Sequence, residues 1–386
     1  MQKIEFTKRL LLLIALLNLV GCQSLNFPSD GGQPFQANNV SQPEEENVSL
    51  DWFTSSQLEP TDTVSVLEAK TFISSVYQTL DEEIFDPAFK EEERDQQLQE
   101  LLNTADTQAN WSRAEITQQV SNELQKLSVS HLRLLDPVEG ERLFRIFEQE
   151  PLPEETPEPA IAAEMRGDIG ILRVESFIVP LITKAELDRA KAQLTQAKVI
   201  LIDVRRNGGG YGSSVSYLVE DIIGPNKVLW RDRTREGLQM QEPYVFQGYF
   251  DDAVNLKAKA EIELGEQHPY IEWQTRSEAQ IDPRPHFVLI DDQCGSACDL
   301  FAAVIKDHGT AQLLGIRTMG ALLGGDAFRL NWPGYALIAP TMQVVSPKGH
   351  TIEGVGVPPD IEIPECANGG SQCLEKALEI VNAAGQ

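Results

Sequence analysis

The sequence predicts an α/β fold with a mainly parallel sheet, preceded by a small helical N-terminal domain. Apolar runs of strand length alternate with segments of helical periodicity at residues 169–204, and the same scheme recurs at 287–315. Between residues 64 and 127 only the helical periodicity is present. Strands that alternate with helices build parallel sheets, because each helix returns the chain to the starting edge of the sheet.

The first 21 residues have the composition of an export signal. Three basic residues among the first nine precede the apolar stretch Leu10–Val20, which is too short to span a bilayer comfortably. The run Leu19-Val20-Gly21-Cys22 is similar to a bacterial lipobox, in which a lipid is attached to Cys22. We therefore expect residues 1–21 to be a lipoprotein signal peptide; the alternative is an uncleaved anchor.

The export signal and the lipobox-like run together predict a bacterial cell-envelope lipoprotein. We expect it to face the periplasm and to contact the membrane through the lipid on Cys22. Gln23 stands where an Asp often retains lipoproteins at the inner membrane, which favours the outer membrane. Residues 22–60 are rich in Ser, Pro, Asn, Gln and Glu and are expected to form a flexible tether. The net charge of −27 disfavours nucleic acid as a partner.

The rest of the chain divides into three predicted parts. Residues 61–136 form the helical region and end in the segment Ser130-His131, and residues 137–166 form a linker. Residues 167–386 form the α/β core, with an insertion at 226–285. The aromatic residues of that insertion predict a small packed subdomain, or alternatively a flap over the substrate: Trp230, Tyr244, Phe246, Tyr249, Phe250, Tyr270 and Trp273.

Four cysteines besides Cys22 could form disulfides in an oxidising envelope compartment. Cys366 and Cys373 are the favoured pair, because they bracket a flexible segment that could close a small loop. Cys294 and Cys298 lie so close together in sequence that the geometry of a bridge stays open. Buried free thiols are the alternative for all four.

Ser296 occupies the position where hydrolases place a nucleophile. It follows the strand-like run Phe287–Ile290 and Gly295, and it precedes a helical pattern. The free N–H groups and positive dipole end of that helix suit a developing oxyanion. The alternative is that Ser296 only caps the helix.

A second distinctive segment, Asn207-Gly208-Gly209-Gly210, follows the apolar strand Val199–Val204. Its N–H groups could form an anion-binding nest, although a tight turn also needs glycines. No Lys-Ser/Thr pair follows, so the run does not predict a nucleotide-binding P-loop.

A nucleophilic serine needs a base, and the chain has five histidines. Three of them, His268, His286 and His308, have structural explanations at a proline, a strand start and a helix end. His131 lies in a segment that alternates like a strand just before Pro137, which by itself favours a structural histidine as well. The five histidines are scattered and no Cys-x-x-Cys spacing occurs, so neither a metal nor another cofactor is expected.

Five segments in order resemble the tail-specific, or C-terminal processing, serine peptidases, over roughly residues 125 to 363. They are Ser130-His131, Gly170-Ile-Leu-Arg-Val-Glu-Ser-Phe, Asp203-Val-Arg-Arg-Asn-Gly-Gly-Gly, Ser296-Ala-Cys-Asp-Leu-Phe-Ala-Ala and Ile352-Glu-Gly-Val-Gly-Val-Pro-Pro-Asp. The resemblance implies a ClpP/crotonase-like ββα core. It also implies serine peptidase activity on proteins or peptides, with the nucleophile at a helix N-terminus.

The resemblance also distinguishes two catalytic schemes within that family. The common one is similar to a Ser-Lys dyad, but the position of the lysine is taken by Ala321 in Thr318-Met-Gly-Ala. The tricorn-core-like branch uses a Ser-His-Ser-Glu tetrad, and this chain has matching residues at its four positions. The resemblance then implies Ser296 as nucleophile, His131 as general base and acid, Ser130 as the linking hydroxyl and Glu353 as the supporting charge.

Adjacent side chains on a regular strand point to opposite faces, so Ser130 and His131 could cooperate only if the chain bends there. The backbone N–H groups of Gly209 and Ala297 would form the oxyanion hole.

The 30 residues 137–166 are too few for the PDZ domain that the family commonly carries between the Ser-His region and the core. Substrate selection would then fall to other surfaces, an adaptor protein or a homo-oligomer. The main alternative function is a catalytically inactive family member that binds an apolar ligand or a protein tail as a scaffold module. Hydrolysis of small esters or lipids would use the same residues.

Overall fold

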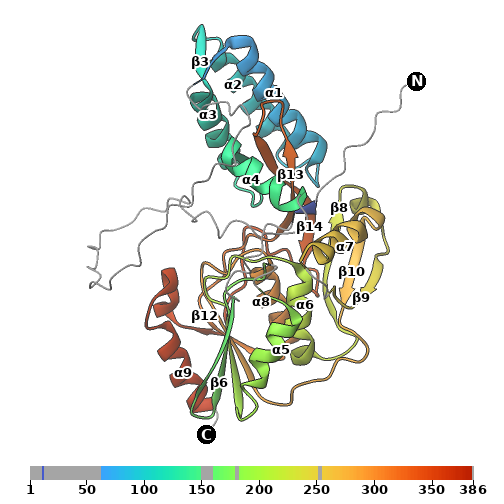
Figure 1. The fold of residues 1–386 in the computed structure, drawn as a ribbon, viewed down its shortest axis with the longest axis vertical. Coiled ribbons are helices and arrows are strands. Elements are labelled where there is room, and N and C mark those ends of the chain that lie inside the picture. Colours follow the sequence, from blue (N-terminus) through green and yellow to red (C-terminus); the bar gives the residue numbers. More distant parts are fainter. Residues whose placement is uncertain (1–10, 13–61, 149–159, 179–181, 251–253, 385–386) are drawn as a thin grey trace.

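The computed structural model describes residues 11–12, 62–148, 160–178, 182–250 and 254–384. A helical unit lies at one end of the molecule, an α/β unit lies at the other, and the strands of a second sheet lie between them (Figure 1). The predicted cleavage site, Cys22 and the tether lie outside the described residues. None of the described helices is both long and apolar enough to cross a membrane.

The helical unit is built from three helices and a two-stranded antiparallel sheet: β2 (Thr63–Ser65), α1 (Val66–Glu83), α2 (Glu91–Ala105), β3 (Asn110–Ser112) and α3 (Arg113–Lys126). Helices α1 and α3 both begin with a capping box, in which Ser65 pairs with Glu68 and Ser112 pairs with Glu115. These boxes satisfy backbone N–H groups that a helix start leaves without partners. The structure therefore confirms the predicted helices, and the sequence of this region also carries the residues that begin two of them.

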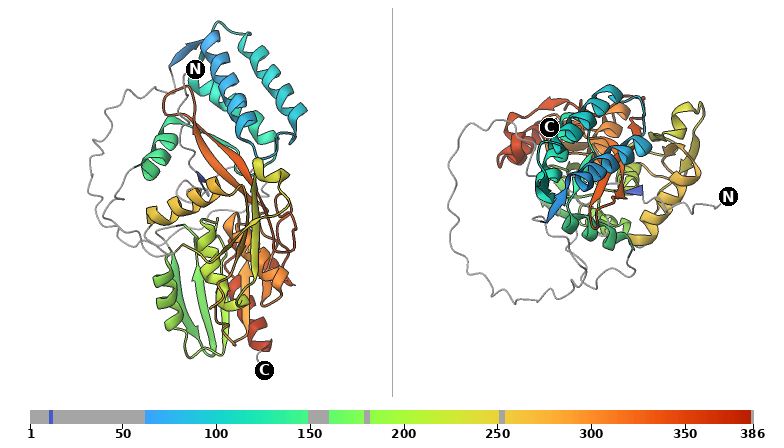
Figure 2. Two further views of the ribbon diagram at one scale, coloured as in Figure 1. Left: turned by 90° about the vertical axis from the view of Figure 1, so that its right-hand side faces the viewer. Right: turned by 90° about the horizontal axis from the view of Figure 1, so that it is seen from above.

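The core of the helical unit includes residues from far along the chain. Phe72 of α1 stacks on Trp332, with ring centroids 3.8 Å apart, and also contacts the edge of Tyr335. Both partners come from the turn between β13 (Leu323–Arg329) and β14 (Ala336–Val345). Figure 2 shows this hairpin reaching from the centre of the molecule to the helices. The helical unit and the hairpin thus share one hydrophobic core.

The α/β unit contains a six-stranded sheet in the order β15-β12-β11-β7-β6-β5. All neighbouring strands are parallel except the β5–β6 pair, which confirms the predicted mainly parallel sheet. Its strands are β5 (Ile161–Arg166), β6 (Ile169–Val174), β7 (Val199–Asp203), β11 (His286–Ile290), β12 (Gln312–Gly315) and β15 (Ile361–Glu362).

Helices cover both faces of this sheet. Alternate strand residues such as Ile202 and Val288 pack with α5 (Lys184–Ala192), α6 (Gly212–Ile223) and α8 (Ala297–His308). The intervening residues pack against η2 (Pro364–Gly369) and α9 (Cys373–Ala384) on the opposite face. Because successive side chains of a strand point to opposite faces, strands buried on both sides are continuously apolar, as the sequence indicated.

The second sheet has the order β1-β13-β14-β8-β10-β9, and β4 (Arg133–Leu135) also pairs with β14. The two-residue strand β1 (Leu11–Leu12) pairs with β13. The predicted insertion supplies β8 (Val228–Thr234), η1 (Glu236–Gln239), β9 (Tyr244–Gln247), α7 (Val254–Gln267) and β10 (Tyr270–Gln274). Since β8 pairs with β14, the insertion extends a sheet of the core.

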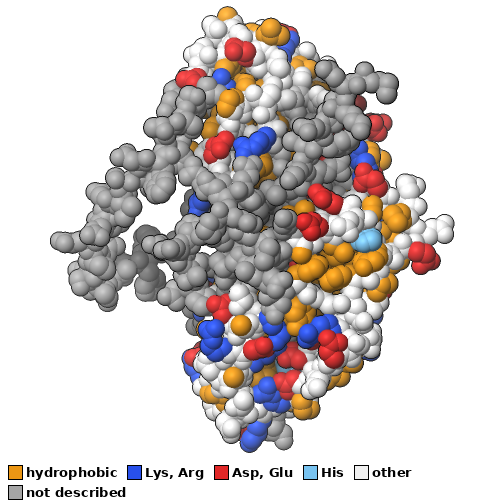
Figure 3. Space-filling model, turned by 45° about the vertical axis from the view of Figure 1, so that its right-hand side comes forward, with side chains coloured by type: hydrophobic (Ala, Val, Ile, Leu, Met, Phe, Trp, Pro, Cys, Tyr) orange, Lys and Arg blue, Asp and Glu red, His pale blue; other side chains and the backbone are white. Residues whose placement is uncertain are grey.

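The aromatic residues of the insertion pack together, as the subdomain interpretation predicted. Trp230 stacks on Trp273 at 4.9 Å between ring centroids, and both indole N–H groups donate to the carboxylate of Asp232. Burial raises the pKa of Asp232 to about 7, although these two hydrogen bonds oppose the shift. Figure 3 shows apolar side chains gathered on the face of the insertion, where Tyr244 and Val245 of the edge strand β9 are exposed.

The segment 137–166, predicted as a linker, contains helix α4 (Pro137–Glu148) and strand β5. Leu143 and Phe144 of α4 are buried against the sheet residues Ala336 and Ile338, so this part is integrated into the fold. Proline suits the first position of a helix because its missing N–H has no partner there. Pro137 therefore occupies the start of a helix within the segment predicted as a linker.

Both nearby cysteine pairs are disulfide-bonded. Cys366–Cys373 was the favoured pair and is confirmed; it joins η2 to α9. Cys294–Cys298, whose geometry the sequence left open, is also bonded and brackets Ser296. Both cysteines of this second pair are fully buried.

Candidate active site

Ser296 lies at the junction of strand β11 and helix α8, as its sequence context predicted. Its backbone has φ 53° and ψ −121°, an unfavourable conformation for a residue with a side chain. The side chain makes no capping hydrogen bond to α8. The alternative that Ser296 only caps the helix is therefore not supported, and the hydroxyl is free to face another group.

His131 faces this hydroxyl from the segment before β4. Its Nε2 lies 3.4 Å from Ser296 Oγ, although the two residues are 165 positions apart in the chain. The expected strand-like conformation is wrong here, because His131 has φ 59° and β4 begins only at Arg133. The positive φ supplies the bend that lets neighbouring side chains meet. Gly325 of β13 makes room for the ring, since a Cβ there would lie 3.0 Å from the Cβ of His131.

Burial lowers the pKa of His131 to about 4, because the desolvated imidazole loses hydration that would stabilise its charge. Both His131 and Ser296 are buried, with exposed fractions of 9% and 5%. At neutral pH the imidazole is therefore uncharged and has one nitrogen that can accept a proton.

Ser130 and Glu353 lie on the side of the His131 imidazole that faces away from Ser296. Ser130 Oγ lies 2.8 Å from His131 Nδ1 and donates to Glu353 Oε2 at 2.7 Å. The backbone N–H of Ser130 donates to the other carboxylate oxygen, also at 2.7 Å. Burial raises the pKa of Glu353, and the hydrogen bonds from Ser130 and from the Leu322 N–H oppose that shift. Glu353 is thus an integral part of this cluster and not a free surface residue.

The hydrogen-bond directions select one tautomer of the imidazole. An ionised carboxylate only accepts, so the Ser130 hydroxyl must donate to Glu353 and accept from His131. His131 then has its proton on Nδ1, and the lone pair of Nε2 points toward Ser296. This is the arrangement in which a histidine can take a proton from a serine.

The glycine run packs directly against the nucleophile position. Gly209 has φ 106°, and a Cβ at this position would lie 2.7 Å from Ser296 Cβ and 2.8 Å from the Ala297 nitrogen. Only glycine fits both the conformation and the space. Among the described residues, no acceptor takes the N–H of Ala297, which therefore points its free donor toward this region.

The other predicted oxyanion donor is already hydrogen-bonded. The N–H of Gly209 donates to Oδ1 of Asn207 at 2.8 Å, and the Asn207 amide in turn donates to the Val174 carbonyl. An oxyanion would have to replace Asn207 as the acceptor of Gly209. Asn207 is fully buried, and the sequence analysis assigned it no role. Its position directly before three glycines was the available signal, because Asn side chains often bond a backbone N–H two residues on.

A lysine dyad has no counterpart in this site. Ala321, at the lysine position of that scheme, has no side chain that could accept a proton; its carbonyl accepts from the Ser296 N–H at 3.1 Å. Within the described parts of the chain, no group of three or more His, Cys, Asp or Glu residues could hold a metal ion.

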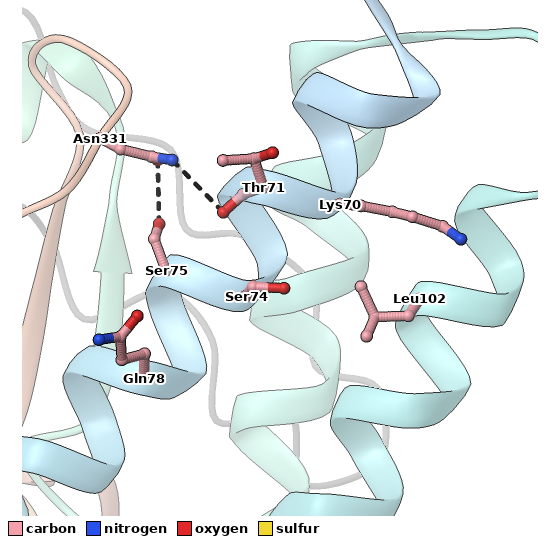
Figure 4. Close-up of a pocket in the computed structure, with 7 residues that line it drawn as sticks. All are labelled: Lys70, Thr71, Ser74, Ser75, Gln78, Leu102 and Asn331. Atoms are coloured by element: carbon pink, nitrogen blue, oxygen red, sulfur yellow. Dashed lines mark hydrogen bonds between the residues drawn. The ribbon is translucent and has the colours of Figure 1, made fainter.

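A pocket with a volume of about 570 Å³ lies elsewhere on the molecule. Figure 4 shows it along helix α1, where Asn331 of the β13–β14 turn bonds Ser75 and the Thr71 carbonyl. Its lining is mainly polar and includes neither a histidine nor an acidic residue. Its serines have no histidine beside them and Lys70 is ion-paired with Asp106, so this pocket is not the candidate site.

A family model described as peptidase family S41 matches residues 168–363 of the chain. The chain belongs to peptidase family S41. The matched segment contains Gly209, Ser296 and Glu353, whereas Ser130 and His131 precede it.

An uncharacterized protein of Chlamydia muridarum is 37% identical over 107 residues, which are 25% of this chain and 18% of that protein. The carboxy-terminal-processing protease of Bartonella bacilliformis is 23% identical over 210 residues, 53% of this chain and 41% of that protein. The chain therefore matches less than half the length of these curated relatives.

A solved structure has a similar fold. The crystal structure of a putative peptidase from Parabacteroides merdae matches with a TM-score of 0.58 at 16% identity, and the match covers 82% of this chain and 97% of that one. At this identity the likeness confirms the S41 fold that the resemblance implied, with its α/β core and helical N-terminal region.

Proposed function

We propose that this S41 protein is a serine endopeptidase that hydrolyses proteins or peptides through an acyl-enzyme on Ser296. One observation supports the proposal most strongly. Four side chains from three distant segments of the sequence form a continuous contact from Ser296 through His131 and Ser130 to Glu353. A hydroxyl, a neutral imidazole, a second hydroxyl and a carboxylate in this order are the groups that proton transfer from a nucleophilic serine needs.

In the proposed reaction, Ser296 Oγ attacks the carbonyl carbon of the scissile peptide bond while Nε2 of His131 takes its proton. The imidazolium that forms is stabilised by Glu353 through the Ser130 hydroxyl, and it then gives the proton to the leaving amine. Water attacks the acyl-enzyme in the second half of the reaction, again with His131 as base.

The free N–H of Ala297 would donate to the oxyanion in both halves, and Gly209 would join it after release from Asn207. The 3.4 Å separation of Ser296 and His131 is longer than an ordinary hydrogen bond to a hydroxyl, and such contacts shorten when substrate binds.

The test is cleavage of an unbiased peptide library by the full-length chain, purified in detergent and followed by mass spectrometry. Wild type should produce defined cleavage products, and Ser296→Ala and His131→Ala should produce none. Cleavage by Ser296→Ala would contradict the proposal. Hydrolysis of small esters without any peptide cleavage would point to an esterase that uses the same residues.

We also propose that the protein is anchored to a bacterial envelope membrane by a lipid on Cys22, because residues 10–22 combine a short apolar stretch with a lipobox-like end. The mass of the N-terminal peptide, measured after expression in a Gram-negative host, tests this directly. A diacylated or triacylated Cys22 at the N-terminus is expected. An unmodified Cys22 behind an intact leader would contradict the anchor.

A further inference from the structure

Asp299 is a buried acidic residue for which the reaction above has no role. It lies in the first turn of α8, three residues after Ser296, and its side chain is fully buried. Its carboxylate accepts hydrogen bonds from the Thr318 hydroxyl, from the Gly320 N–H at 3.0 Å and from the Ala321 N–H at 2.8 Å. Three donors of the segment 318–321 thus converge on one carboxylate, which offsets the cost of burying it.

The segment 318–321 also holds the backbone around the nucleophile. The Ala321 carbonyl accepts from the Ser296 N–H at 3.1 Å, and the Met319 N–H donates to the Cys294 carbonyl at 2.9 Å. Asp299 is therefore connected to Ser296 in two ways. One connection runs along the backbone of α8, and the other runs through the segment 318–321, which the carboxylate holds in place.

The segment also touches the loop that carries Glu353. The Gly354 N–H donates to the Gly320 carbonyl at 2.7 Å, and the Val357 N–H donates to the Thr318 hydroxyl at 2.8 Å. The two loops pack without intervening side chains, because a Cβ on Gly320 would lie 2.5 Å from the nitrogen of Gly356. A shift of the segment 318–321 would therefore move Glu353.

We propose that Asp299 is a positioning residue. Its carboxylate accepts three hydrogen bonds from the segment 318–321, and the segment held in this way fixes the position of Ser296 relative to Glu353. The proposal rests on the function proposed above, since it assigns Asp299 a task in the same site. Only the carboxylate form can serve, because a protonated acid or an amide would place a donor against one of the three donors.

The ionisation of Asp299 gives the proposal a pH signature. Burial raises its pKa to about 6, the hydrogen bonds from Thr318, Ala321 and Gly320 oppose the shift, and the charge of Glu353 adds to it. Among the described residues, Glu353 is the charged group that acts on Asp299 from another element. As pH falls below about 6, Asp299 gains a proton and the segment loses its acceptor. His131, with its pKa of about 4, is still neutral at that point.

The test compares Asp299→Asn with wild type in peptide cleavage and in the rate of Ser296 labelling by a fluorophosphonate probe, from pH 4.5 to 8. We expect kcat to fall by roughly 10- to 100-fold and KM to change less than about threefold, since one charge-assisted contact is lost away from the substrate. The wild-type acid limb should have its midpoint near pH 6. The residual activity of Asp299→Asn should persist to lower pH.

Asp307→Asn is the matched control. Asp307 lies on the same helix, is nearly buried and accepts from the Ser346 hydroxyl and the Lys348 N–H instead of from the segment 318–321. It should keep the wild-type acid limb. Should Asp299→Asn fail to fold, Thr318→Val tests the same link, because it removes the hydroxyl that joins Asp299 to Val357, and it should also lower kcat.

Labelling and cleavage by Asp299→Asn within about threefold of wild type, with the same acid limb, would overturn the proposal and leave the function intact. A folded wild-type chain that neither cleaves nor labels would overturn both.

Discussion

Replacing Ser130 with alanine separates the imidazole from its carboxylate and leaves the nucleophile and base in place. The hydroxyl makes two hydrogen bonds, at 2.8 Å to His131 and at 2.7 Å to Glu353. In the alanine variant Glu353 keeps the backbone N–H of residue 130, but its charge no longer reaches the imidazolium through a hydroxyl. The loss should therefore appear when the histidine becomes cationic.

The size of the effect follows from the kind of hydrogen bond that is lost. A hydrogen bond to a charged group contributes about 1.5–3 kcal/mol, and each 1.36 kcal/mol is a factor of about ten in rate. We expect kcat to fall by about 10- to 150-fold, with KM nearly unchanged because Ser130 does not contact the nucleophile or the glycine run.

Steady-state peptide cleavage measures this effect, with Ser128→Ala as the control. Ser128 is two residues away and exposed, and its hydroxyl donates to the Lys126 carbonyl at 3.3 Å, so its alanine variant should keep full activity. A Ser130→Ala rate within about threefold of wild type would refute the role of the linking hydroxyl.

Three further predictions concern the surroundings of the site and the insertion. Gly209→Ala places a methyl 2.7 Å from Ser296 Cβ at a φ of 106°. Labelling of Ser296 by the fluorophosphonate probe should therefore slow by about 100-fold, while the helix content measured by circular dichroism stays unchanged. Labelling at the wild-type rate would show that the glycine run can move away from Ser296. Replacing Cys294 and Cys298 together by alanine should also slow labelling, because their disulfide brackets the nucleophile, and a rate equal to wild type would mean that the bridge serves stability alone. Asp232→Asn should raise the melting temperature more at pH 8.5 than at pH 5. The folded pKa of about 7 exceeds the unfolded value of 3.8, so the contribution of Asp232 to stability is present below 3.8 and lost as pH rises through 7. Calorimetry that finds equal shifts at both pH values would contradict this.

Local patterns predicted much of the α/β unit. The continuous apolar runs became β7 and β11, and the helical pattern after Asp299 became α8, because strands and helices buried in a layered fold reveal their period in sequence. The helical segment within the alternating stretch 169–204 became α5, which ends at Ala192. Long-range packing was not visible: nothing near Phe72 indicates that its stacking partner is Trp332.

The candidate site shows the same division. The types and order of Ser130, His131, Ser296 and Glu353 could be compared with a family motif, whereas their geometry depends on backbone conformations that the sequence does not display. The positive φ of His131 is imposed by the surrounding structure and contradicts the alternating pattern around it. Asn207 and Asp299 escaped notice because their roles arise from contacts with segments distant in the chain.

Reaction of the full-length chain with a fluorophosphonate probe, read by intact mass, tests the central claim most directly. The probe reports an activated serine without any knowledge of the substrate. The account predicts one adduct on wild type, mapped to Ser296, and none on folded Ser296→Ala or His131→Ala. A folded wild-type chain without an adduct, or a His131→Ala variant that labels as fast as wild type, would contradict it.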